Sequence, residues 1–367
     1  MGIAVGFLTA CLVSTTACGA EPDVFRAKVP YPPSAVIESI TWHWETRQTA
    51  ALGSDLWPVT WGVDGSLYAA WGDGGGFGGS DEDGRVSMGF ARIDGPPESF
   101  VGTNVNGGKN PEHPASFPHS GKTGGILSVS GVIYAWMNMQ NGRWPDVDMS
   151  LIWSDDQGAT WKSAPWIFPR GPGNFRPGTF LNFGRDYTGV PRDLQGYVYF
   201  YGIRQGDDSQ TFMGRAPLDK IRDRSAYQFL RGLDASNQPA WGKGTDQLYP
   251  IFKDPPSGGG GMVAYIPALR RYLLSTFHDG PGQLGIFDGP KPWGPWTSVA
   301  YYEDWGKMGT DGEGLTCDFP EKWMSADGLK LWCVFSAYGK GARQGINAHD
   351  RFNLVQATLA LRQREVP

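Results

Sequence analysis

The chain repeats a short hairpin pattern five times at nearly even spacing. Each unit is a β-rich run, a tight turn and a second β-rich run. The turns fall near residues 64, 131, 195, 268 and 327, which gives steps of 67, 64, 73 and 59 residues. A repeat of this size fits a four-stranded blade with long loops, and such units must stack to bury a common core. The spacing predicts an all-β chain folded as a five-bladed β-propeller.

The turns have the residues that tight hairpins require. The first joins residues 56–61 to 66–71 through Val63-Asp64-Gly65, and the second joins 126–129 to 132–136 through Ser130-Gly131. The other three turn near Gln195-Gly196 before 197–201, at 267–270 between 262–266 and 272–277, and at Asp327-Gly328 between 323–324 and 329–335. Asp-Gly between apolar runs is the strongest local hairpin signal.

Composition agrees with this fold and excludes one class of partner. The chain has 53 glycines, 13% aromatic residues and only 19% charged residues, a mixture typical of short strands joined by tight turns. No long apolar stripe has the helical period, so we expect little helix. The net charge of −5 argues against a nucleic-acid partner.

One blade has a second sequence signature. Residues 154–161, Ser-Asp-Asp-Gln-Gly-Ala-Thr-Trp, match the Asp-box of sialidase-type propellers. Its Asp156 accepts backbone hydrogen bonds, Gly158 supplies a permissive backbone and Trp161 packs beneath the turn. In families that have the box it is structural and faces away from the active site. We therefore exclude Asp156 from catalysis.

The N-terminus indicates export. Residues 3–13 are nearly all apolar and no charge precedes Glu21, which is typical of a secretory signal and too short for a membrane span. Cys18 follows Thr15-Thr16-Ala17, which is similar to a degenerate bacterial lipoprotein site. We expect a signal peptide over 1–20, a linker over 21–40 and the propeller over 41–364. The protein would be secreted, or lipid-anchored at the cell envelope through Cys18.

The remaining cysteines and histidines point to no metal. Cys317 and Cys333 could pair in an oxidising compartment or stay as buried thiols, and both options remain open. Five scattered histidines without a Cys-x-x-C motif argue against zinc. The acidic loop with Asp311, Glu313 and Asp318 lacks the spacing of a calcium site. We expect a monomer without a cofactor.

Two aspartates are the candidate catalytic groups. If Asp64 is the turn, reflection pairs residue i with residue 128 − i, so Asp55 lies opposite Asp73. Directly opposite Cβ atoms are about 4.5–5.5 Å apart. Two adjacent carboxyls cannot both ionise freely, and one raised and one lowered pKa suit hydrolysis of a glycosidic bond. The structural alternative makes Asp55 a strand cap and Asp73 an ordinary turn residue.

The neighbouring sequence favours a hydroxyl-rich ligand. The loop 72–79 is mostly glycine and leaves room for a substrate, while Trp57 and Phe77 offer flat faces on which sugar rings stack. The same reflection in the other blades predicts a polar rim that binds the substrate. Its members are Lys122, Asn138, Asp186, Arg204, His278, Asp279 and Glu321.

Several segments resemble one bacterial family. Ser54-Asp55-Leu56-Trp57-Pro58 with Trp71-Gly72-Asp73-Gly74 is similar to the opening blade of a domain-of-unknown-function family that includes endo-D-arabinanases. Segments 216–221, 225–229, 292–297 and 322–328 are similar to its later parts, so the resemblance covers roughly residues 40–362. It implies a five-bladed glycoside hydrolase fold. It also implies that Asp55 and Asp73, at the matching positions, take part in catalysis.

The primary hypothesis is an exported glycoside hydrolase that cleaves a polysaccharide, with a furanose polymer such as D-arabinan as the expected substrate. Here Asp55 is the nucleophile or base and Asp73 the general acid. The alternatives are a non-catalytic carbohydrate-binding propeller, a sialidase-like hydrolase and a polysaccharide lyase. A sialidase would require an arginine cluster that is not evident, and a lyase would use Tyr249 or His278 as its base.

Overall fold

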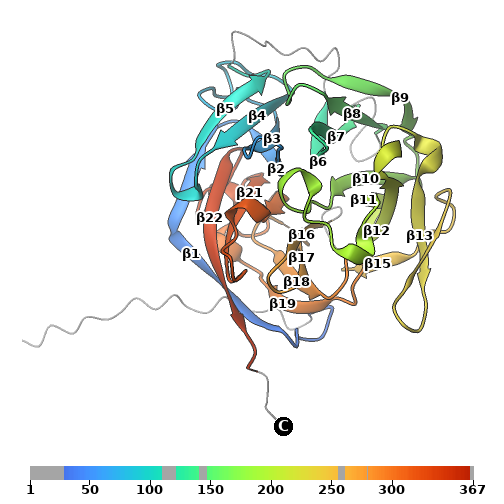
Figure 1. Cartoon of the computed structure of the whole chain (residues 1–367). Helices are drawn as coiled ribbons and strands as arrows, with labels where there is room; N and C mark the ends of the chain where they lie inside the picture. Colours follow the sequence, from blue (N-terminus) through green and yellow to red (C-terminus); the bar gives the residue numbers. More distant parts are fainter. Residues whose placement is uncertain (1–28, 110–120, 140–146, 255–260, 279, 364–367) are drawn as a thin grey trace, which may run out of the picture.

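The protein is an all-β propeller. The computed structural model describes residues 29–109, 121–139, 147–254, 261–278 and 280–363. Five antiparallel sheets are arranged radially around a central axis (Figure 1), which confirms the predicted fold class. The signal segment 1–20, Cys18 and Asp279 lie outside the described residues.

Each sheet is one blade, and in the first four blades the strand that comes first in the chain is innermost. Blade one contains β2 (Asp55–Trp61), β3 (Leu67–Gly72), β4 (Met88–Asp94) and β5 (Val101–Asn106). Blade two contains β6 (Lys122–Val129), β7 (Val132–Asn138), β8 (Met149–Ser154) and β9 (Lys162–Phe168). Blade three contains β10 (Phe175–Phe180), β11 (Tyr197–Arg204), β12 (Asp207–Pro217), β13 (Gln228–Leu233), β14 (Pro239–Gly242) and β15 (Pro250–Lys253), which pairs with β12.

The last two blades complete the ring. Blade four contains β16 (Met262–Ile266), β17 (Arg271–Phe277), β18 (Leu284–Gly289) and β19 (Thr297–Tyr301). Blade five contains β20 (Glu313–Asp318), β21 (Lys330–Tyr338), β22 (Phe352–Leu361) and the N-terminal strand β1 (Ile37–Ala50). Short 3-10 helices in the connections span Pro97–Ser99, Arg185–Tyr187, Arg192–Leu194, Leu218–Lys220, Arg224–Ala226, Trp305–Lys307, Glu321–Trp323 and Gly341–Arg343.

Blade five closes the ring with both ends of the chain. β1 pairs with β22 from Ile37 opposite Leu361 to Ala50 opposite Phe352. The strand starts at Ile37, before residue 41, and delivers the chain directly into blade one. Because β1 and β22 come from opposite ends of the sequence, their ladder fixes the segment that leads into blade one to the last blade.

The hairpin predictions hold for the tightest turns. Val129 is opposite Val132, and the two residues between them, Ser130 and Gly131, both have positive φ of 53° and 76°. Two left-handed residues make the type I′ turn that matches strand twist. In blade five the prediction for 323–324 was wrong, because this segment is not a strand. Trp323 instead is buried at the boundary with blade one, and its indole Nε1 donates to the Gly95 carbonyl at 3.3 Å.

Aromatic side chains fill the spaces between blades. The Trp136 and Phe180 rings stack with centroids 5.0 Å apart between blades two and three. Trp161 stacks on Phe90 of blade one at 3.8 Å, directly after a turn in which Asp156 accepts hydrogen bonds from the Thr160 backbone N–H (2.8 Å) and hydroxyl (2.6 Å). Such pairs add specific geometry to the burial of large apolar area.

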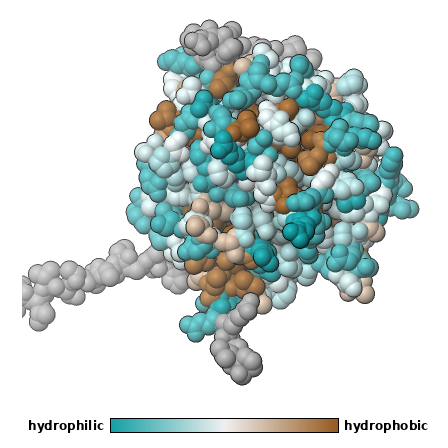
Figure 2. Space-filling view, viewed as in Figure 1, coloured by the Kyte–Doolittle hydropathy of each residue, from teal (hydrophilic) through white to brown (hydrophobic). Residues whose placement is uncertain are grey.

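The strands define two ends of the propeller. Each blade has one inner strand: β2, β6, β10, β16 or β20. All five inner strands begin at the same end of the propeller, which we call the Asp55 end. They connect to the next strand of their blade at the opposite end, which we call the turn end. Hydrophilic residues cover most of the face in Figure 2, and hydrophobic residues form several patches, one of them below its centre. Among the described residues, no helix has the length and apolar character needed to cross a membrane.

Candidate active site

Asp55 and Asp73 come together at the Asp55 end of blade one. The first hairpin follows the predicted register at its turn, where Val59 is opposite Ala69 and Trp61 opposite Leu67. An irregularity between Leu56 and Val59 then shifts the ladder by one residue, so Asp55 is opposite Gly72 rather than Asp73. Asp73 is the next residue along the chain, and its charge still acts on Asp55.

The irregularity has a visible cause in the backbone. Leu56 and Trp57 both have positive φ, 71° and 70°, which is uncommon for non-glycine residues. The Trp57 indole is fully buried and stacks on Trp71 with centroids 5.5 Å apart, and its Nε1 donates to the Ser54 carbonyl at 2.8 Å. Packing of this large ring holds the unusual backbone just after Asp55.

Asp73 is bound by two cations. Lys122, at the start of β6, places its Nζ 2.6 Å from Asp73 Oδ1 and also donates to the Ser87 carbonyl at 2.5 Å. Arg85 lies 3.4 Å from Asp73 Oδ2 and 2.6 Å from Asp81. Both contacts require Asp73 as the carboxylate, the form needed of a nucleophile or base.

The surroundings of Asp55 instead favour the neutral, protonated form of its carboxyl. Burial raises the pKa of its carboxyl to about 7, Lys122 opposes this rise, and the charges of Asp350 and Asp73 add to it. Within the described part of the chain, Asp55 Oδ1 is buried and has no hydrogen-bond partner. A carboxyl with such a pKa is about half protonated at pH 7, far more than an ordinary aspartate, and can donate that proton, as a general acid does.

Gly72 makes room for the Asp55 carboxyl. A Cβ at this position would overlap Asp55 Oδ1 and would lie 2.8 Å from Lys122 Cδ. The side chains of Asp55 and Lys122 therefore meet over bare backbone. The sequence predicts that this glycine leaves space for a substrate. In the structure, its lack of a side chain makes room for the Asp55 carboxyl and the Lys122 side chain.

The structure adds a group that the sequence reasoning missed. Asp350, just before β22, accepts a hydrogen bond through its carbonyl from the Gly53 N–H at 2.7 Å, and its carboxylate lies 3.1 Å from His349 Nδ1. The His349 ring contacts Tyr338, whose side chain is 51% exposed at the Asp55 end of β21. The only sequence hint is that Asp tolerates positive φ, which is 41° at Asp350.

Of the two predicted aromatic platforms, Trp57 is a core residue and Phe77 is partly buried against the core. Trp57 is fully buried. Phe77 lies with its centroid 5.1 Å from Trp57 and 5.6 Å from Phe352, and its backbone N–H donates to Asn104. Both rings pack against the core beside the glycine loop. The platform interpretation was wrong for the fully buried Trp57, whereas for the partly buried Phe77 it stays a prediction. The loop turns inward because its backbone is fixed by Asn104 and Ser54.

Three further predicted residues do lie at the Asp55 end. Asn138 is 5% exposed, and the fully buried His278 stacks on Tyr301 with centroids 4.0 Å apart. Arg204 donates to the Gly173 carbonyl at 2.7 Å. All three contact neighbouring protein groups in this structure.

Asp186 and Glu321 lie at the opposite, turn end, so the predicted single rim was wrong for them. Asp186 accepts hydrogen bonds from Gly131 N–H, 3.0 Å from each oxygen, and from Ser128 Oγ at 2.8 Å. The long connection between β10 and β11 returns to the neighbouring hairpin turn instead of continuing away from it. Glu321 follows β20 at the same end.

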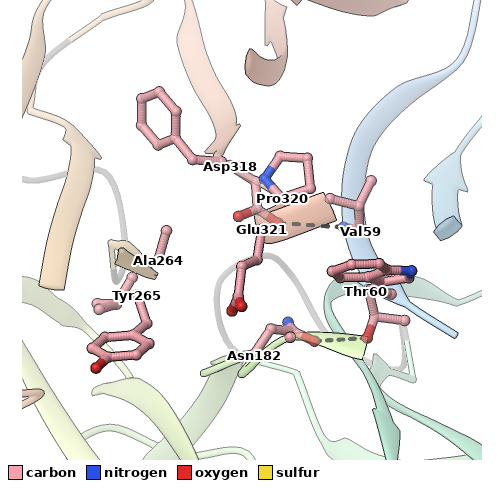
Figure 3. Close-up of a pocket in the computed structure, with 12 residues that line it drawn as sticks. Val59, Thr60, Asn182, Ala264, Tyr265, Asp318, Pro320 and Glu321 are labelled. Atoms are coloured by element: carbon pink, nitrogen blue, oxygen red, sulfur yellow. Dashed lines mark hydrogen bonds between the residues drawn. The ribbon is translucent and has the colours of Figure 1, made fainter. Parts of the chain in front are cut away.

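A pocket at the turn end contains a second pair of carboxyls. Its volume is about 360 Å³ including the part open to solvent, and Figure 3 shows Glu321 pointing into it between Tyr265 and Asn182. Burial raises the pKa of Asp318 and that of Glu321 to about 7. The Asp318 carboxylate accepts from the Val59 N–H at 3.4 Å. This group is built from backbone-bound carboxyls and has no counterpart of Lys122 in the described chain.

The cysteines and acidic loop can also be placed. Cys317 and Cys333 are buried free thiols with Sγ atoms 3.0 Å apart. Among the described residues, no three His, Cys, Asp or Glu side chains gather as a metal-binding group.

Comparison with solved structures gives the same fold. One, titled a "putative hydrolase" from Bacteroides ovatus ATCC 8483, has a TM-score of 0.52 at 10% identity, covering 83% of this chain and 85% of that one. A GH43_1 enzyme from Xanthomonas citri has a TM-score of 0.48 at 12% identity, covering 87% and 94%. The α-L-arabinofuranosidase PaAbf62A from Podospora anserina, in complex with cellotriose, has a TM-score of 0.46 at 11% identity, covering 84% and 91%.

Sequence comparison gives the family. No curated protein sequence matches the chain. Residues 125–320, more than half of the 367 residues, match the family described as a domain of unknown function, DUF4185. The chain therefore belongs to the DUF4185 family.

Proposed function

We propose that the protein is a glycoside hydrolase whose catalytic groups are Asp55 and Asp73. The observation that carries this proposal is the asymmetry of the pair. Burial raises the pKa of Asp55 to about 7, whereas Asp73 forms ion pairs with Lys122 and Arg85. One protonated and one ionised carboxyl side by side are what glycoside hydrolysis requires.

The electrostatics favour the reverse of the roles expected from the sequence. Asp55 would donate its proton to the glycosidic oxygen as the bond between that oxygen and the anomeric carbon breaks. Asp73 would either attack the anomeric carbon or take a proton from the water that attacks it. Lys122, which faces both carboxyls, would hold Asp73 in its charged form while Asp55 changes charge.

The expected substrate is a furanose polymer such as D-arabinan. The resemblance of residues 54–58 and 71–74 to the endo-D-arabinanase relatives supports this substrate class. The exposed Tyr338 ring, rather than Trp57, would supply a stacking face for a sugar. Export, suggested by the N-terminal apolar segment, would give access to such a polymer.

A second candidate function is carbohydrate binding without hydrolysis. The two cations on Asp73 favour it, because a carboxylate used as a structural ion-pair partner need not react. In that case, the same end of the propeller would bind a polysaccharide and release no product.

One experiment separates these functions. The purified protein is incubated with D-arabinan, L-arabinan, xylan and other bacterial and plant polysaccharides, and released oligosaccharides and bound polymer are both measured. Release of oligosaccharides supports the hydrolase. Binding without release selects the binding propeller, and neither binding nor release by any polysaccharide contradicts both.

A further inference from the structure

We propose that Asp350 is a third carboxyl of this site, a positioning residue that acts through Asp55. The inference deepens the proposed function and rests on it. Nothing in the first-blade motif includes Asp350, which the fold brings from the last blade.

The backbone places Asp350 beside the first blade. The β1–β22 ladder ends with Ala50 opposite Phe352, so the loop that leads to Asp55 runs beside the loop that leads into β22. The Gly53 N–H donates to the Asp350 carbonyl at 2.7 Å, and the Asp350 N–H donates to the Ala337 carbonyl at 3.0 Å. Asp350 is thus fixed between the approach to Asp55 and the end of β21.

Only one of the two carboxylate oxygens of Asp350 has a polar partner among the described residues. Oδ2 lies 3.1 Å from His349 Nδ1, whereas Oδ1 is buried and, among the described residues, has no hydrogen-bond partner. The residue also holds a positive φ of 41°. A buried carboxylate oxygen without a hydrogen-bond partner is costly, and a native structure that keeps one calls for a functional explanation.

Charges of both signs act on the two carboxyls. Asp55 is faced by Lys122 and Arg85, which favour its charged form, and by Asp350 and Asp73, which disfavour it. Asp350 is faced by Asp81 and Asp73, by Arg343 and Arg85, and by its neighbour His349. Burial raises the pKa of Asp350 to about 6, below that of Asp55.

The negative charge of Asp350 gives the residue its effect. Whenever Asp350 is ionised, its charge disfavours ionisation of Asp55. The proton on Asp55 is retained to a higher pH than it would be otherwise. A general acid needs that retained proton at neutral pH.

The test is a direct titration of Asp55. The protein is labelled with ¹³C-carboxyl aspartate, and the Asp55 signal is assigned by its loss in Asp55→Asn. In Asp350→Asn, the midpoint of Asp55 should fall by about 0.5–1 pH unit, the size expected for removal of one nearby like charge. Asp350→Glu, which keeps the charge, should restore the midpoint.

A matched control and a second readout complete the test. Asp83→Asn removes an exposed carboxyl that pairs with Lys109 and should leave the Asp55 midpoint unchanged. With an active substrate, the alkaline limb of kcat/KM in Asp350→Asn should move to lower pH by the same amount. An unmoved Asp55 midpoint in folded Asp350→Asn overturns the inference. The titration needs no substrate, so absence of hydrolysis counts against the proposed function alone.

Discussion

At Gly72, the missing side chain leaves the space in which the Asp55 carboxyl lies. Asp55, Gly72 and Lys122 come from two neighbouring strands of one blade and from the first strand of the next. A change of one methyl group at Gly72 therefore bears on the position of both charged groups. This makes Gly72 a sharper probe of the site than removal of either charge.

Gly72→Ala should reduce hydrolysis at least about 10-fold, because displacement of a catalytic group by about 1 Å can cost up to 100-fold. The extra methyl group should destabilise the fold by about 1–3 kcal/mol. Rates on the responsive polysaccharide and thermal unfolding measure the two effects. Gly232→Ala is the control, since a Cβ there has no atom within 4 Å. Full activity of Gly72→Ala would show that the Asp55 position is unimportant.

The sequence predicted the turn of the first hairpin and the proximity of Asp55 and Asp73. Reflection about Asp64 gave the correct register from Val59 to Trp61 and still brought Asp55 near Asp73. It could not foresee the one-residue shift, which depends on two left-handed residues held by tertiary packing. The sequence does not predict that Asp350 lies near Asp55, because the two residues are far apart in the chain and come together only when blade five closes the ring.

At the scale of strands and loops, the glycine loop and the start of β2 show how packing overrides local pattern. Trp57 follows a candidate catalytic residue and is apolar and flat, which are also the properties of a sugar platform. The positive φ at Leu56 and Trp57 turns the indole into the cluster formed with Trp71, Phe77 and Phe352. Neither the amino-acid composition nor the repeat spacing predicts this change of backbone direction.

Trp57→Ala should lower the free energy of unfolding by about 3–5 kcal/mol, as expected for a large aromatic deleted from a packed core. Chemical denaturation measures this change. Tyr338→Ala, which removes a half-exposed ring at the same end, should change stability by no more than about 0.5 kcal/mol. If Trp57→Ala were as stable as Tyr338→Ala, the indole would not be a core residue.

The hairpin turns were predicted better than the helical connections. Ser130-Gly131 specifies its turn locally, because two positive φ angles need such residues. The connection 319–329 contains apolar Trp323 and an Asp-Gly turn and therefore resembles a hairpin in sequence. Its Trp323 packs instead across the boundary with blade one, a contact that only the closed ring provides.

For the whole molecule, the repeat spacing was the decisive signal. Even steps between five turns predicted five blades, and the ring has them. The sequence does not show that β1 would complete the last blade, since strand pairing between the two ends of a chain has no local signature. That closure nevertheless places Asp350 beside Asp55.

Stability should fall as pH rises from about 4.5 to about 7.5. Asp318 and Glu321, like Asp55, have their pKa raised to about 7 by burial, above the values in the unfolded chain. In this window the folded state holds more protons than the unfolded state, so deprotonation favours unfolding. The expected loss is on the order of 3 kcal/mol for each of Asp318 and Glu321, from about 1.4 kcal/mol per pH unit between the unfolded and folded pKa values.

Urea unfolding at several pH values tests this dependence. The double variant Asp318→Asn with Glu321→Gln should lose less stability over the window, because neutral amides remain in place of the two buried carboxyls. Asp83→Asn, an exposed change, should follow the wild type. A wild-type stability that is flat or rises between pH 4.5 and 7.5 would be inconsistent with the buried, protonated carboxyls.

Hydrolysis by Asp55→Asn and Asp73→Asn on the responsive polysaccharide tests the account most directly. Each variant should lose at least about 100-fold in turnover, the typical contribution of one acid or base group, while polymer binding and a cooperative unfolding transition are retained. Asp83→Asn should keep wild-type turnover. Near-normal turnover in both folded variants would contradict the assignment of Asp55 and Asp73 as the catalytic pair.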